Sequence, residues 1–188
     1  MSAFSVRRVL VLAVFLATAL VGGAGAASAS TSAPYCGITW GSLDKSTSPG
    51  GGNALTDART GQHDCYDRVV FDFDGGAVSS SVGYATAVYT QGKGDPLDIA
   101  GGAKLNVLLI GNDYDINTGV GTYPHRAGDH VANVSGYRTL RDVVYGGSFE
   151  GYTTFGIGVR ARLPFRVFTL AGPGTHGRVV IDIAHRWS

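Results

Sequence analysis

The sequence predicts an all-β fold, a sandwich of two mainly antiparallel sheets with at most one short helix, that follows a cleaved signal peptide. From residue 66 onward, short runs rich in Val, Ile, Tyr and Phe are separated by Gly, Asp, Asn and Pro, a pattern typical of closely spaced strands. Two of these runs, DRVVFDFDG at 67–75 and GRVVIDIAH at 177–185, repeat Arg-Val-Val-apolar-Asp-apolar at a separation of 110 residues. The N-terminal stretch differs in character from everything that follows it.

Residues 1–29 have the organisation of a secretory signal peptide. Arg7 and Arg8 form a basic region, an apolar run at 9–21 follows, and Ala27-Ser28-Ala29 fits the small-residue pattern that signal peptidase cleaves. We expect cleavage after Ala29 and a mature protein that is secreted and extracellular, either free or associated with the cell wall. No later stretch has the roughly 18 apolar residues that a membrane-spanning helix needs, so we expect no membrane span in the mature protein.

The predicted mature chain is a single-domain length, 159 of the 188 residues. It carries 13 Lys and Arg against 14 Asp and Glu, a net charge of −1. This balance gives no electrostatic basis for binding nucleic acid or an anionic membrane surface.

The chain has two cysteines, Cys36 and Cys65, and both follow the predicted cleavage site. In an oxidising compartment such a pair is most simply a disulfide; metal ligation or redox catalysis is the alternative, but the chain has no CxxC motif. We therefore divide the mature chain into a segment at 30–65, closed by this disulfide, and a β domain at 66–188. Residues 41–62 contain five glycines and little apolar periodicity, which predicts a surface loop.

The two repeated runs predict strands with one apolar face and one mixed face, because successive side chains of a strand point to opposite sides. Each Asp shares its face with an Arg four residues earlier, too far for an easy direct pair. We therefore expect Asp72 and Asp182 to have structural roles, each with a partner on a neighbouring strand. The predicted apolar faces are Val69, Phe71 and Phe73 in the first run and Val179, Ile181 and Ile183 in the second.

Further strands are predicted from their apolar content, and turns from their Gly and Pro content. Residues 137–145, YRTLRDVVY, fit either a short helix or a strand. The remaining predicted strands are 83–89, 103–110, 149–155, 156–163 and 165–170, with turns at 92–96 and 171–177.

Several ordered motifs resemble the AMIN-like family, actinobacterial secreted relatives of the AMIN domain. They are YCGITWGS at 35–42 ahead of DRVVFDFDG, then FEGYTTFGIGVRARLPFRV at 149–167, and the ending FRVFTLAGPGTHGRVVIDIAH at 165–185. The resemblance spans about residues 35–188. It implies a β-sandwich that serves as a non-catalytic envelope module, since AMIN domains are associated with targeting of cell-wall amidases and secretins and with peptidoglycan binding. We expect this chain, unlike those larger proteins, to carry no amidase or secretin domain.

The resemblance also implies paired strands of similar sequence, which leaves two interpretations of the repeat. The two runs are related by internal symmetry of the sandwich, or each is an ordinary strand with one covered face and one mixed face.

Two segments contain residue types that bind metals, but neither has the spacing of a known site. Asp113, Asp115 and Asn117 alternate as in a calcium loop, yet the sixth position is Thr118 instead of Gly and the twelfth is Pro124 instead of Glu. We expect a solvated turn there, with a weak calcium site as the alternative. The second segment is HRAGDH at 125–130, which does not match a zinc motif. We therefore expect no metal and no cofactor.

No catalytic constellation can be assembled from the sequence, so we expect the protein not to be an enzyme. There is no G-x-S-x-G elbow, and no nucleophile, base and orienting group can be named together. A small secreted hydrolase that uses Asp72, Asp74 and Asp182 is the least favoured function, because nothing in their spacing supports it.

The predicted ligand-binding face comes from GIGVRARL at 156–163, where alternation puts Gly156, Gly158, Arg160 and Arg162 on one side. Two arginines on an open face provide donors for carboxylates or sugar hydroxyls of peptidoglycan or another wall glycan. The alternative is that both arginines pair with Asp72 and Asp182 across the sheet. The predicted aromatic contacts to the ligand are Tyr84, Tyr89, Tyr114 and Tyr123.

The alternative function is a protein-interaction module that docks on another exported protein through a sheet edge.

Overall fold

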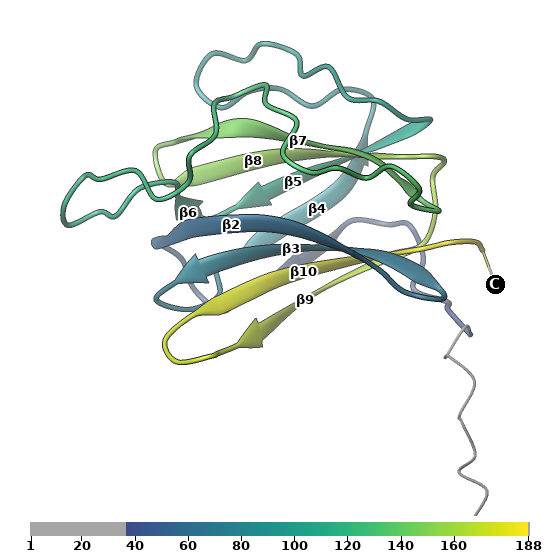
Figure 1. Ribbon diagram of the computed structural model, residues 1–188, viewed down its shortest axis with the longest axis horizontal. Helices are drawn as coiled ribbons and strands as arrows, with labels where there is room; N and C mark the ends of the chain where they lie inside the picture. The colour runs from purple at the N-terminus through teal and green to yellow at the C-terminus, as the bar shows by residue number, and fades with distance from the viewer. Residues whose placement is uncertain (1–36, 188) are drawn as a thin grey trace, which may run out of the picture. The chain divides into compact units, whose positions relative to one another are not determined.

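The computed structural model describes residues 37–187, and this part of the chain contains ten strands and no helix (Figure 1). The predicted all-β sandwich of two sheets is confirmed. The predicted signal peptide, its cleavage site and Cys36 lie outside the described residues. The strands are β1 Lys45–Thr47, β2 Asn53–Gln62, β3 Tyr66–Asp74, β4 Ser80–Ala85, β5 Ala103–Leu109, β6 Gly111–Asn112, β7 Leu140–Phe149, β8 Tyr152–Val159, β9 Phe165–Ala171 and β10 Gly177–Ala184.

Two five-stranded sheets face each other, as Figure 1 shows. Sheet A has the strand order β1-β4-β5-β8-β7, and sheet B has the order β6-β2-β3-β10-β9. Every pairing is antiparallel except the short parallel one between β2 and β6. Within the described part of the chain, no helix is long and apolar enough to cross a membrane.

The core lies between the sheets and contains the apolar faces predicted for the two repeated runs. Val69, Phe71 and Phe73 of β3 are fully buried there, as are Val179, Ile181 and Ile183 of β10. Phe155 of β8 meets Phe71 across the sandwich at a centroid separation of 4.5 Å. Burial of this many large side chains is the main term that stabilises the fold.

The two repeated runs pair with each other as neighbouring antiparallel strands of sheet B. Val70 of β3 lies opposite Val180 of β10, so Arg68 lies opposite Asp182 and Asp72 lies opposite Arg178. The repeat therefore has a local two-fold relationship, and each Arg of one copy is opposite the Asp of the other. Of these two opposed pairs, Arg68 and Asp182 form an ion pair at 2.6 Å.

The surface loop predicted at 41–62 is wrong, because β1 and the whole of β2 lie in this range. A β-bulge between Leu55 and Asp57 shifts the alternation of β2 by one residue. Leu55 and Ala58, three residues apart, are consequently both buried in the core. The bulge therefore interrupts the alternation of apolar and polar residues from which a strand at 53–62 could have been predicted.

The ambiguous segment at 137–145 is a strand from residue 140 onward, the first half of β7. The strands predicted separately at 149–155 and 156–163 are wrong in their boundaries, because one strand, β8, crosses the division. Glu150 and Gly151 form the turn before β8, both with positive φ values of 51° and 82°. Gly156 and Gly158 do not end the strand, because both lie directly under the segment at 86–102.

Candidate functional site

The predicted open face around Gly156 and Gly158 does not exist, because a segment at 86–102 covers it. Leu97 and Ile99 of this segment are buried with Val144 on the outer side of sheet A. A Cβ on Gly158 would overlap the carbonyl oxygen of Ala100, and one on Gly156 would overlap Ile99. The glycines therefore permit close packing of this cover and leave no open surface for a ligand.

Arg160 and Arg162 follow the end of β8 and lie on the surface, where each donates to a backbone carbonyl. The Arg160 guanidinium donates to the His185 carbonyl oxygen. Arg162 donates from Nε to Ser42 Oγ at 3.2 Å and from Nη2 to the Ser42 carbonyl oxygen at 3.0 Å. The alternative pairing with Asp72 and Asp182 is wrong, since both aspartates have other arginine partners.

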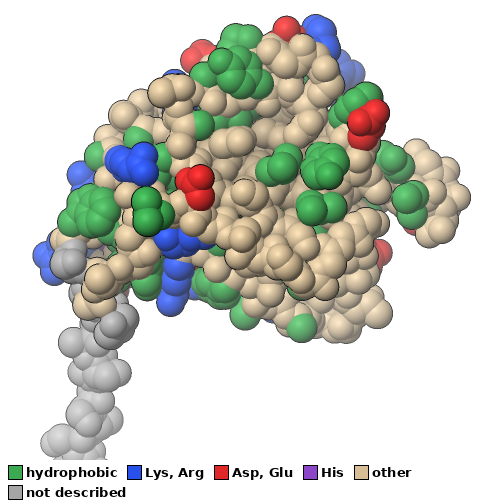
Figure 2. All heavy atoms as spheres, turned by 180° about the vertical axis from the view of Figure 1, so that it is seen from behind, with side chains coloured by type: hydrophobic (Ala, Val, Ile, Leu, Met, Phe, Trp, Pro, Cys, Tyr) green, Lys and Arg blue, Asp and Glu red, His purple; other side chains and the backbone are tan. Residues whose placement is uncertain are grey.

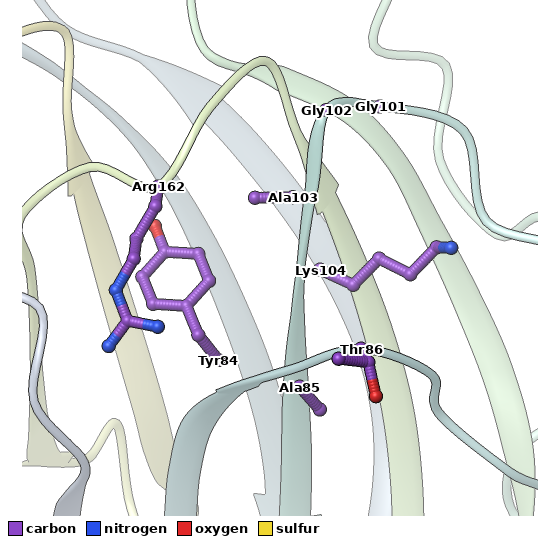
Figure 3. Close-up of a pocket in the computed structure, with 8 residues that line it drawn as sticks. All are labelled: Tyr84, Ala85, Thr86, Gly101, Gly102, Ala103, Lys104 and Arg162. Carbon is purple, nitrogen blue, oxygen red and sulfur yellow. The ribbon is translucent and has the colours of Figure 1, made fainter.

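Tyr84 and Arg162, two of the predicted ligand residues, do come together at a pocket of about 330 Å³ (Figure 3). The Arg162 guanidinium carbon lies 4.8 Å from the centroid of the Tyr84 ring. Tyr84 Oη donates to the Leu163 carbonyl oxygen and accepts from the Leu163 amide, both at 2.8 Å. These two hydrogen bonds fix the ring, and partial burial raises the pKa of the Tyr84 hydroxyl.

The rest of this pocket is lined by small residues and one lysine. Gly101 and Gly102 form its upper wall, and Ala103 lies at its centre (Figure 3). Lys104 extends away from Arg162 in this view, so the two cations do not converge on one point. The pocket thus presents a single guanidinium stacked on an aromatic ring.

The other three predicted tyrosines are not part of this pocket. Tyr89 and Tyr114 are exposed at 54% and 38%, one on the segment that covers sheet A and one on the loop after β6. Tyr123 is only 6% exposed and packs in the core against Tyr145 and Phe155. Its predicted contact with a ligand would require opening the core.

The metal candidates Asp113, Asp115 and Asn117 lie in a turn whose oxygens have other partners. Asp115 Oδ1 accepts from the amides of Asn117 and Thr118 at 2.7 and 3.3 Å, and Asp113 Oδ2 accepts from the Tyr145 hydroxyl at 2.7 Å. Among residues 37–187, no group of three His, Cys, Asp or Glu side chains is placed to hold a metal ion.

The histidine segment is also divided among different partners. His125 Nδ1 lies 3.7 Å from Asp129, whereas His130 Nδ1 lies 2.8 Å from Asp142 of β7. The hydrogen bond with Asp142 raises the pKa of His130.

A second surface, which the sequence did not single out as a binding site, lies on the outer face of sheet B. Its centre is Asp182, which is fully buried and bound by two arginines. Arg68 donates to Asp182 from Nε at 2.6 Å and from Nη2 at 2.9 Å, and Arg166 of β9 donates from Nε at 2.8 Å. Two guanidinium groups around one carboxylate leave the cluster with a net positive charge, and the Asp182 hydrogen bond raises the pKa of Arg68 further.

Three aromatic rings surround these arginines, and we call the whole set the arginine–aromatic face. The Arg166 guanidinium carbon lies 4.3 Å from the Trp40 centroid and 5.1 Å from that of Phe168. Arg68 lies 5.3 Å from the Tyr66 centroid, and Trp40 meets Tyr66 edge to face. The arginine–aromatic face consists of Trp40, Tyr66, Arg68, Arg166, Phe168 and Asp182.

Residues 40–42 connect the arginine–aromatic face to the Tyr84–Arg162 pocket. Trp40 belongs to the first, Ser42 accepts from Arg162 of the second, and the Gly41 carbonyl between them accepts from the Phe165 amide at 3.0 Å. Figure 2 shows basic and hydrophobic side chains intermixed on the surface near the beginning of the described chain. Residues 40–42 thus contact an arginine of each site, and we call the two sites together with these residues the basic strip.

The basic strip has the chemistry of a binding surface for carboxylates and hydroxyls. The Arg166 side chain is 40% exposed, so part of its guanidinium faces solvent while another part holds Asp182. Aromatic rings beside such donors provide flat apolar contacts for a sugar ring or a ligand backbone. Sequence reasoning missed both Arg166 and Trp40, because Arg166 meets Asp182 only through the register of β9 and β10, and Trp40 lies outside any strand.

A family model, the AMIN-like domain, matches residues 53–185, from the start of β2 to just beyond β10. The chain belongs to the AMIN-like domain family. No curated protein matches the chain. Membership indicates a cell-envelope-associated module, and AMIN-like domains are generally non-catalytic.

Proposed function

We propose that this AMIN-like protein is an exported, non-catalytic module that binds peptidoglycan or another wall component through the basic strip. The observation that carries the proposal is that residues 40–42 contact both Arg162 and Arg166, each of which is stacked on an aromatic ring. Both guanidinium groups are fixed by protein contacts, so little side-chain entropy is lost when a ligand binds.

The chemistry of a peptide-substituted glycan fits this arrangement. Peptide-stem carboxylates suit arginine donors, and sugar rings suit the exposed parts of Trp40 and Tyr84. Because the strip is open and shallow, we expect weak binding to each repeating unit of a polymer, with affinity that accumulates over several units.

The direct test is co-sedimentation of residues 30–188 with insoluble peptidoglycan. We expect the chain to pellet with the polymer, and soluble muropeptides to compete it away. The double variant Trp40→Ala, Arg162→Ala should lower the apparent affinity about tenfold, a loss of roughly 1.4 kcal/mol. The matched control is Arg126→Ala, which removes an exposed arginine far from the strip in sequence and outside it in the structure.

Two results would contradict the proposal. One is that neither the parent chain nor the control pellets above the level of an unfolded sample. The other is that all three chains pellet equally and muropeptides do not compete, which would indicate binding elsewhere on the surface.

The alternative function, docking through a sheet edge, also has a structural counterpart. β9 ends sheet B, and most of its outer edge lacks backbone partners among the described residues.

A further inference from the structure

β9 differs from the other edge strands of the sandwich because it is long and largely uncovered. At the edge of sheet A, β7 is covered by a neighbouring segment, with the Val131 amide donating to Val143 at 2.8 Å and the Tyr145 amide donating to Asp129 at 2.9 Å. The edge strands β1 and β6 have only three and two residues. β9 has seven, and Figure 1 shows it at the border of sheet B.

The hydrogen-bond pattern shows which groups of β9 point away from β10. The Ala184 amide donates to the Pro164 carbonyl at 2.9 Å, while the Phe165 amide donates outward to Gly41 at 3.0 Å. Because this direction alternates along an antiparallel strand, Val167, Thr169 and Ala171 also point their amide and carbonyl groups outward. In the described part of the chain these groups have one partner, Arg178 Nη2, which donates to the Ala171 carbonyl at 3.2 Å.

The sequence of the open part of this edge is compatible with antiparallel pairing between two copies of β9. Gly41 occupies the edge at Phe165 and the turn begins at Gly172, so the outward groups run from Val167 to Ala171 with Thr169 at their centre. An antiparallel copy centred on Thr169 places two Thr169 residues opposite each other and Val167 opposite Ala171 of the partner subunit. All three pairs are of the hydrogen-bonded kind, because each member points its backbone groups at the other strand.

The side chains also agree with this register. On the outer face, Phe168 lies opposite Leu170 of the partner subunit, and cross-strand apolar pairs of this kind stabilise a sheet. Arg166 lies opposite Gly172 of the partner subunit, so the two Arg166 side chains are kept apart. A register centred on Phe168 would place Ala171 of the partner subunit where Gly41 already lies.

The inner side of the edge has room for the second strand's side chains. Thr169, Leu170 and Ala171 line a cavity of about 440 Å³ together with small residues that include Gly50, Gly51 and Gly76. The Thr169 side chain of an added strand therefore points toward this cavity and not toward a filled core.

We propose that β9 pairs with β9 of a second copy of this chain, antiparallel and centred on Thr169, so that sheet B continues across a two-fold axis. Natural proteins usually protect a long edge strand with charges, proline, a bulge or a covering segment. Self-pairing removes the unpaired groups of this edge without such a device. The inference is independent of wall binding, because it concerns the chain alone in solution.

Disulfide trapping tests the register. Opposite residues of a hydrogen-bonded antiparallel pair have Cα atoms about 5.5 Å apart, within the range that a disulfide spans. Thr169→Cys should therefore form a covalent dimer on mild oxidation. Ala171→Cys is the matched control, because its counterpart in the partner subunit lies four residues along the strand, roughly 14 Å away.

We expect at least tenfold more covalent dimer for Thr169→Cys than for Ala171→Cys on a non-reducing gel. The parent chain is run as a third sample, because it shows how much dimer the native cysteines form by themselves. Ala171 is the more exposed of the two positions, so random collision would favour the control. Equal trapping of both variants, or none, would overturn the proposal.

A second measurement does not depend on new cysteines. Sedimentation equilibrium of the unmodified chain should show a monomer–dimer equilibrium, and Leu170→Lys should weaken it at least fivefold by placing a charge against Phe168 of the partner subunit. Val120→Lys, at a residue 64% exposed on another loop, is the control. A chain that stays monomeric would show that β9 is not a self-pairing edge, and would favour a strand of another exported protein as its occupant.

Discussion

Arg68 and Asp182 are 114 residues apart in the sequence and form a bidentate pair on sheet B, with Nε–Oδ1 and Nη2–Oδ2 distances of 2.6 and 2.9 Å. Both belong to the repeated Arg-Val-Val-apolar-Asp run, but each comes from a different copy. The pair exists because β3 and β10 lie side by side in a register centred on Val70 and Val180. Asp72 and Arg178, the symmetry-related pair, are opposite in register, yet Asp72 is bound by Arg59 of β2 at 2.6 Å instead.

The first prediction compares these two carboxylates. Arg68→Ala removes one of the two partners of fully buried Asp182, and should lower the free energy of unfolding by about 2–3 kcal/mol, since a buried charge is left partly uncompensated. Arg59→Ala is the control, because its side chain is 49% exposed and its pair with Asp72 should contribute about 0–1 kcal/mol. Urea unfolding of both variants measures the difference. Equal losses would show that burial of Asp182 does not govern the energetics of this face.

The second prediction concerns Asp67, a fully buried carboxylate in β3 that joins three segments. It accepts from the Thr139 and Leu140 amides at 2.6 and 3.0 Å and contacts His185 Nε2 at 3.0 Å. Asp67→Asn replaces the charged carboxylate by a neutral amide, and should cost about 2–3 kcal/mol because hydrogen bonds to a charged acceptor are the stronger ones.

Asp64→Asn is the matched control for Asp67→Asn. Asp64 is exposed and is bonded only through its backbone carbonyl among the described residues, so its side-chain change should alter stability by less than about 0.5 kcal/mol. Thermal unfolding followed by circular dichroism compares the two variants. If Asp67→Asn were as stable as the control, Asp67 would not be the anchor of the 138–140 segment.

The third prediction tests the cover over sheet A. Gly158→Ala introduces a methyl group that overlaps the Ala100 carbonyl, and should destabilise the fold by about 1–3 kcal/mol as the cover is displaced. Gly121→Ala is the control, because no atom lies within 4 Å of its added Cβ. Amide hydrogen exchange should show faster exchange of the 86–102 segment in Gly158→Ala alone. Unchanged exchange would show that the added methyl group does not displace the 86–102 segment.

The fourth prediction is a pH dependence that arises from His130 and Asp142. The pKa of His130 is raised mainly by its hydrogen bond with Asp142, with smaller contributions from Asp98 and Asp129. Since the folded-state pKa lies above the unfolded value, this pair stabilises the fold fully below about pH 6.5 and loses its contribution as pH rises through the folded-state pKa. The stability difference between the parent chain and His130→Ala should therefore be constant below about pH 6.5 and shrink as pH rises through the folded-state pKa of His130.

His130→Gln separates charge from hydrogen bonding in this test, because glutamine keeps a neutral donor toward Asp142. Its stability relative to His130→Ala should not change over the same pH range. A difference between parent and His130→Ala that is constant with pH would show that protonation of His130 does not contribute.

Three strands show how far the sequence predicts this structure: β3 and β10 were predicted correctly, and β2 was not. β3 and β10 each have apolar residues at every second position over six residues, and the opposite face carries Arg and Asp, so their strand type and core faces were predictable. β2 was predicted as a loop, because its bulge at Leu55 and Asp57 breaks the alternation and the backbone pairing with β3 leaves no trace in side-chain pattern. The predicted ligand residues do not all lie together, because their positions depend on contacts between distant segments. Tyr123 is in the core, while Tyr84 and Arg162 share a pocket.

The sequence by itself determined the class of fold, the AMIN-like resemblance, and the expectation that each buried-strand aspartate would have a partner on a neighbouring strand. The fold class and the expected partners follow from local alternation and composition, which a single chain segment displays, and the resemblance follows from ordered motifs along the chain. Tertiary structure alone decided which arginine meets which aspartate, that the glycines of β8 lie beneath a covering segment, and that Trp40 stacks on Arg166. Those outcomes depend on strand order and register, which bring together residues more than a hundred positions apart and are set by how the whole core packs.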